Sequence, residues 1–166
     1  MNIQVELQVV AGDGSVPDEK HFSRWASAAA AGRADDGELS IRVVDEAESR
    51  SLNSRYRDRQ CATNVLAFPA TLPDELGLPL LGDLAICRDV IEREAREQGK
   101  ETEAHWAHMV VHGTLHLLGY DHQTQNQAHA MESLEVQVLQ GLGYADPYAP
   151  NGENREQAPA GTTGAE

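Results

Sequence analysis

The chain has 166 residues, 40% of them hydrophobic and only 5% aromatic, which predicts one domain with a mainly aliphatic core. No apolar run approaches the length of a membrane-spanning helix, and no secretory signal is recognisable. The 13 basic and 27 acidic side chains give a net charge of −14, which disfavours non-specific binding to nucleic acid. Two cysteines, Cys61 and Cys87, form neither a disulfide framework nor a redox pair, so we expect a cytoplasmic protein.

The first part of the chain mixes strand and helix patterns. Apolar and polar residues alternate in the first predicted strand, at 3–9. Asp45 is expected to cap a polar helix, and Pro69 to end a short strand. We predict strands at 3–9, 40–45, 65–68 and 82–87, and helices at 18–31 and 45–56.

The rest of the chain is predicted to be helical, at 88–98, 102–118 and 125–142. Gly99 and Gly119 are expected to end the first two of these helices, and Thr102 is a candidate cap. The pattern predicts a single α/β (α+β) domain at 1–149, with a small mixed sheet of about four strands packed against about five helices. The tail at 150–166 has almost no apolar residues, and we expect it to be disordered.

Five of the seven histidines fall between positions 105 and 122. At 100° per residue, four of them lie within about 80° of one another on one face of the predicted helix: His105, His108, His112 and His116. His112 and His116 are one helical turn apart, about 6 Å along the axis, which suits two imidazoles that bind one Zn²⁺. Gly119 can adopt a left-handed conformation and let the chain bring His122 back to the same face. Three neutral imidazoles would leave a fourth position for a water molecule with a pKa of about 7. The sequence therefore predicts a zincin-like site with three histidine ligands.

These histidines and Gly119 match the spacing of the metzincin protease motif H-E-x-x-H-x-x-G-x-x-H. Gly113, however, stands where the proteases have the glutamate that acts as general base. Without that base, peptide hydrolysis loses a factor of about 10²–10⁴. The motif thus indicates a zinc hydrolase with another substrate, and a metalloprotease is the disfavoured alternative.

The run His112–His122, HGTLHLLGYDH, resembles the signature of the YbeY family of bacterial endoribonucleases, which are ribosomal-RNA maturation factors. This chain departs from the family pattern at Ala62, where proline is usual, and at Ala67, where serine is usual. Both differences are expected to alter only the local backbone or packing. The resemblance covers about residues 1–149. Further segments that agree with the family, in the same order, are 52–57, 62–69, 81–87 and 142–148.

The resemblance implies one zinc ion on His112, His116 and His122. It implies a single-strand-specific endoribonuclease that matures the 3′ end of small-subunit ribosomal RNA and contributes to ribosome quality control. The implied partners are ribosomal RNA, the small ribosomal subunit and ribosome-associated proteins, and neither DNA nor a membrane is expected.

Arginines are concentrated at positions 51–60, which carry a net charge of +2. A guanidinium group can bind a phosphate through two hydrogen bonds. Arg57 matches the family's functional arginine, and we expect it to neutralise the phosphate. The other candidates for this basic patch are Arg55, Arg59, Arg88 and Lys100.

Several roles stay open from the sequence. Asp121 is a candidate to orient a ligand histidine or to act as a base, and equally to cap the turn after Gly119. His105 and His108 are interpreted as hydrogen-bond donors behind the ligands, as RNA contacts or, preferably, as ordinary surface residues. A non-catalytic assembly factor with structural zinc is a further alternative, which a cysteine in the fourth ligand position would favour.

Overall fold

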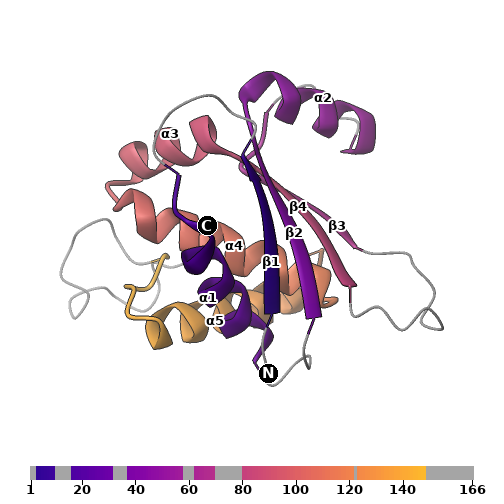
Figure 1. The fold of residues 1–166 in the computed structure, drawn as a ribbon. Helices are drawn as coiled ribbons and strands as arrows, with labels where there is room; N and C mark the ends of the chain where they lie inside the picture. The colour runs from indigo at the N-terminus through magenta and orange to yellow at the C-terminus, as the bar shows by residue number, and fades with distance from the viewer. Residues whose placement is uncertain are drawn as a thin grey trace.

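The computed structural model describes residues 3–9, 16–31, 37–57, 62–69, 80–121 and 123–148, apart from the side chains of Arg57 and Leu80. Within these ranges the chain folds into a four-stranded sheet and five helices, which confirms the predicted α+β architecture (Figure 1). In the same ranges no helix is long and apolar enough to cross a membrane. The elements are β1 (Ile3–Val9), α1 (Glu19–Ala30), β2 (Gly37–Val44), α2 (Glu46–Arg57), β3 (Val65–Pro69), β4 (Leu80–Cys87), α3 (Arg88–Gln98), α4 (Thr102–Leu117) and α5 (Gln125–Gly141).

The sheet is mixed and has the order β1-β2-β4-β3. Strands β1, β2 and β4 run parallel, and β3 pairs with β4 in the antiparallel direction. Helices α1, α4 and α5 pack together on one face of the sheet, and α4 also contacts β3 and β4 (Figure 1). Helix α4 therefore lies beneath the antiparallel edge of the sheet, and both α1 and α5 pack against it.

Successive side chains of β2 point to opposite faces of the sheet, and those on one face are buried. Leu39, Ile41 and Val43 are at most 1% exposed and join the helices in the main hydrophobic core. Complete burial of such a side chain stabilises the fold by roughly 1.5–3 kcal/mol. Helix α4 is the most enclosed of the helices that the structure describes, because ten of its 16 residues are buried. A helix enclosed on nearly all sides places its polar side chains in the interior as well.

At Gly113, α4 approaches the sheet closely. A Cβ atom added there would lie 2.7 Å from Cδ2 of Leu84 and 3.3 Å from Cγ2 of Val65. The first distance is shorter than normal van der Waals contact. The residue that stands where metzincins carry their glutamate thus faces the packed sheet.

The end of α4 is shaped by Gly119, as the sequence predicts. Its φ is +105°, in the region that favours glycine. The Tyr120 N–H donates to the Leu115 carbonyl at 3.0 Å, and the Gly119 N–H donates to the His116 carbonyl at 3.0 Å. These two bonds are a Schellman motif, which satisfies the last carbonyls of the helix.

Several predicted boundaries need correction. Thr102 is not a cap, because it is already helical and Glu101 precedes the helix without a side-chain cap bond. Thr124 caps α5 in a capping box with Gln127, a Thr-x-x-Gln pattern that the sequence does contain. Strand β2 begins at Gly37 because pairing with β1 extends it, and β3 includes Pro69, which an edge strand tolerates. The predicted disordered tail lies outside the described residues.

We expect Gly119→Ala to destabilise the protein by about 1 kcal/mol or more, because alanine is strained at positive φ. Urea unfolding measures this loss. Gly141→Ala is the matched control: Gly141 is exposed, helical and has open space around its Cα, so alanine there should be neutral or slightly stabilising. Equal stabilities for the two variants would contradict the cap assignment.

We expect Gly113→Glu to lose at least about 3 kcal/mol of stability, because it forces an unpaired carboxylate against the buried Leu84 side chain. Gly113→Ala should cost less, since a Leu84 methyl group can shift and alanine favours the helix. Urea unfolding measures the loss in the free energy of unfolding for each variant. A Gly113→Glu protein as stable as the parent would show that the position is not packed as described.

Candidate metal site

Four histidines form a row along α4: His105, His108, His112 and His116. Successive ring centroids are 6.1, 6.4 and 4.9 Å apart, and each ring meets the next edge to face. This confirms the prediction that the four share one face of the helix. The closest pair is His112 and His116, at the end of α4 that leads to the Gly119 turn. Two imidazoles one turn apart at this separation fit the ligand spacing of a single zinc ion.

The row is buried at one end and more open at the other. His105 and His108 are only 2% and 6% exposed, whereas His112 and His116 are half-buried. The favoured interpretation of His105 and His108 as surface residues is therefore wrong. They are buried because α3 and α5 pack against α4, and each of those helices supplies a carboxylate to the row.

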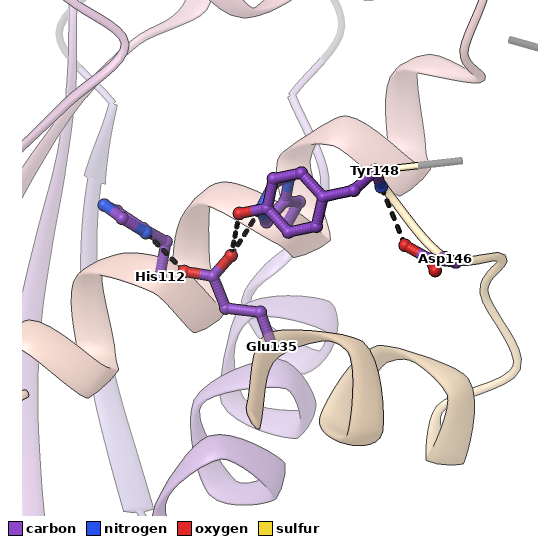
Figure 2. Close-up of polar contacts among 5 residues, drawn as sticks. His112, Glu135, Asp146 and Tyr148 are labelled. Carbon is purple, nitrogen blue, oxygen red and sulfur yellow. Dashed lines mark hydrogen bonds and ion pairs between the residues drawn. The ribbon is translucent and has the colours of Figure 1, made fainter. Parts of the chain in front are cut away.

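The carboxylate from α5 belongs to Glu135, which is completely buried. Its Oε2 lies 2.5 Å from Nδ1 of His112, and its Oε1 lies 2.9 Å from Nε2 of His108 (Figure 2). The Tyr148 hydroxyl also donates to Oε1. One buried carboxylate thus joins a predicted ligand, its neighbour in the row and the segment that follows α5.

The pKa values of Glu135 and its neighbours favour an ionised carboxylate at this position. Burial works to raise the pKa of Glu135, but hydrogen bonds from His108 and His112 outweigh it and hold the pKa far below its ordinary value. Burial lowers the pKa of His108, and burial together with the charge of Glu135 raises the pKa of Tyr148. Glu135 is therefore ionised at neutral pH, and Tyr148 keeps its proton.

The carboxylate from α3 belongs to Glu94 and makes a second, separate pair. Its Oε1 lies 2.8 Å from Nε2 of His105, and the Asn64 side-chain amide donates to the same oxygen at 3.1 Å. Burial opposes ionisation of Glu94, but the hydrogen bonds from His105 and Asn64 lower its pKa. This pair does not include any of the predicted ligands, so it provides a structural comparison for the Glu135 pair.

The third predicted ligand, His122, lies outside the described residues, as do Arg59 and Cys61. Within the part of the chain that the structure describes, no group of three or more His, Cys, Asp or Glu side chains could hold a metal ion. The three-histidine set therefore stays a prediction, of which the structure brings two members, His112 and His116, together.

Of the basic residues, Arg57 ends α2, but its side chain is outside the described residues. Arg55 is exposed, with its guanidinium 5.9 Å from the centre of the Tyr56 ring. Arg88 is mostly buried and pairs with Asp89 at 3.3 Å. Burial lowers the pKa of Lys100, which lies near the carboxylates of Glu94, Asp146 and Glu135. Arg88 and Lys100 thus offer less accessible charge than Arg55.

A cleft of about 740 Å³ lies away from the histidines, on the sheet face opposite α4. Its lining includes the acids Glu6, Glu48 and Asp83. Its arginine, Arg42, is paired with Glu48 at 2.8 Å. The described lining is therefore net negative and unsuited to an RNA backbone.

Asp121 is half-buried just after the Gly119 turn, and its proposed roles stay predictions. A carboxylate that does meet His112 belongs to Glu135, which was not predicted from the sequence, and neither was Tyr148. A signal for Glu135 is present: it stands on the stripe of α5 that also carries the buried Met131 and Val138. A lone carboxylate on a buried helix face calls for a partner.

The Glu94 pair makes stability depend on pH in a defined direction. Because folding lowers the pKa of Glu94, its ionised form stabilises the fold above the ordinary value of 4.5, and this contribution is lost as the pH falls through the folded pKa. We expect Glu94→Gln to cost about 1–2 kcal/mol near neutral pH and less in acid. Urea unfolding of both proteins from about pH 6 to pH 3.5 measures the difference. A gap that widens on acidification would contradict this assignment.

Comparison with known proteins confirms the resemblance seen in the sequence. A family model described as "Endoribonuclease YbeY" matches residues 14–143. A relative from Pseudomonas entomophila, named Endoribonuclease YbeY, is 56% identical over 148 residues, which are 89% of this chain and 94% of the relative. The solution structure of a Thermotoga maritima protein has a TM-score of 0.54 and 23% identity, covers 90% of this chain and 99% of its own, and supports the fold alone. The chain belongs to the endoribonuclease YbeY family.

Proposed function

We propose that this protein is a cytoplasmic, zinc-dependent endoribonuclease that cleaves single-stranded RNA and matures the 3′ end of small-subunit ribosomal RNA, contributing to ribosome quality control. Family membership supports the nuclease activity. The observation that carries the metal dependence is the close pair of His112 and His116 on α4, with His112 held by a buried carboxylate. A histidine ligand commonly has such a carboxylate on its other ring nitrogen.

The residues proposed to hold zinc are His112, His116 and His122. When bound there, a zinc ion would act as a Lewis acid on a phosphoryl oxygen, or lower the pKa of a water molecule, or do both. The chain's own contribution is to hold the two α4 imidazoles 4.9 Å apart, at the half-buried end of the row. Physiological use of another divalent ion is compatible with three histidine ligands.

Arg57 is proposed to bind the scissile phosphate and offset the negative charge that develops on it. Asp121 is proposed either to orient a ligand histidine or to serve as a base. Because the chain carries a net charge of −14, free RNA should bind weakly. We therefore propose that docking on the small ribosomal subunit, or on a ribosome-associated protein, presents the RNA end to the site.

Two alternatives receive less support. A metalloprotease lacks its general base, and Gly113 packs too tightly against Leu84 to be replaced by glutamate without cost. A structural zinc site would be favoured by a cysteine ligand, but Cys87 lies in an apolar cluster with Val44 and Val90, where burial raises the pKa of its thiol. Cys61, the other candidate, lies outside the described residues.

Cleavage of ribosomal RNA within purified small subunits tests the proposal. We expect the parent protein to cut and a chelator to stop it. His116→Ala should lose at least about 100-fold in rate because a ligand is removed. Arg57→Ala should lose about 10²–10³-fold while it retains bound metal, because only a stabilising donor is lost. His129→Ala, which removes an exposed histidine on α5, is the matched control and should cut normally.

The pattern of activities separates the explanations. Equal cutting by all the proteins would identify a contaminating nuclease. Absence of cutting by the parent protein on intact subunits would favour the non-catalytic assembly factor. Loss of bound zinc in Arg57→Ala would contradict a role confined to phosphate binding.

A further inference from the structure

We propose that Glu135 is a positioning residue for the metal: it fixes His112 as the tautomer whose lone pair is on Nε2. The inference rests on the proposed zinc site and adds a residue that lies on α5, away from the α4 motif. It assigns a purpose to a carboxylate that is completely buried yet is not itself a predicted ligand.

The hydrogen bond between Glu135 and His112 determines where the imidazole proton lies. An ionised carboxylate only accepts hydrogen bonds, so Nδ1 of His112, 2.5 Å from Oε2, must be the donor. A neutral imidazole carries a single N–H, so its lone pair is then on Nε2. Zinc binds the lone pair of a neutral imidazole. The contact thus selects Nε2 as the binding atom and limits rotation of the ring.

The two carboxylate oxygens of Glu135 have different partners and different roles: one is held in place and the other positions His112. Oε1 accepts from the Tyr148 hydroxyl and lies 2.9 Å from Nε2 of His108, while Oε2 meets His112 (Figure 2). Tyr148 is itself anchored, because its backbone N–H donates to Oδ1 of Asp146 at 2.8 Å. The carboxylate is therefore held from α4 and from the segment after α5, so that it presents a fixed oxygen to His112.

A purely structural role accounts less well for this arrangement. Burial of a charged group is expensive, and apolar residues of similar volume often serve stability equally well. The pair of Glu94 and His105 shows that α4 also carries a carboxylate–histidine pair with no predicted ligand in it. Glu135 differs in that it reaches the histidine whose other nitrogen is needed for zinc.

The experiment measures two properties of the zinc-free protein and its variants. Nitrogen-15 NMR of the histidine rings should show the His112 proton on Nδ1 in the parent protein and a mixture of tautomers in Glu135→Gln, because a glutamine side chain can donate as well as accept. Zinc titration against a competing chelator should show about 10- to 100-fold weaker binding by Glu135→Gln.

Two further variants keep the test independent of general damage to the fold. Glu94→Gln removes the partly buried carboxylate of the other carboxylate–histidine pair and should leave the zinc affinity unchanged. Tyr148→Phe removes one support of Oε1 but keeps the contact with His112, so it should weaken zinc binding less than Glu135→Gln does. Thermal unfolding of each zinc-free variant reports whether it is folded.

The outcomes distinguish this inference from the proposed function. A parent protein that binds no zinc would overturn the proposed metal site itself. If the parent binds zinc and Glu135→Gln binds it equally well, the metal site stands and the positioning role is overturned. The role also fails if the His112 proton is on Nε2 in the parent, or if Glu94→Gln weakens zinc binding as much as Glu135→Gln.

Discussion

The buried carboxylate of Glu135 is the contact on which the arrangement of the site depends. It ties α5 and Tyr148 to two histidines of α4, inside a region from which water is largely excluded. Burial disfavours its charge, so the charge persists only because several donors converge on it. If any one of these donors is removed, the Glu135 carboxylate remains buried with fewer hydrogen bonds. The orientation of His112 is consequently coupled to the packing of α5 rather than determined by α4 alone.

The backbone of α4 imposes a second constraint, which separates this site from that of the metzincins. Gly113 lets the helix approach Leu84 and Val65, and so the histidine row is held beneath the antiparallel edge of the sheet. The same close approach leaves no room for the protease glutamate. Gly119, three residues after His116, then turns the chain away from the helix with a left-handed conformation. Close packing on one side and an abrupt helix end together define where the proposed ligands can lie.

Much of this architecture could be predicted because local signals were strong. Alternation identified β1, the glycines located the ends of α3 and α4, and the spacing of the histidines put four of them on one helix face. Thr102 was misassigned because a threonine at a helix start also fits the first turn. Glu135 and the burial of His105 were missed because both depend on the packing of α3 and α5 against α4, which sequence spacing does not specify. The roles of Arg57, Asp121 and His122 stay predictions.

The most direct test of the account is a crystal structure of the zinc-loaded protein with anomalous diffraction recorded at the zinc edge. We predict one peak about 2.0–2.1 Å from Nε2 of His112, shared with His116 and His122, while Nδ1 of His112 still meets Glu135. Zinc bound to Nδ1 of His112, or a peak away from α4 in crystals saturated with zinc, would contradict the role of Glu135 in orienting this histidine for the metal.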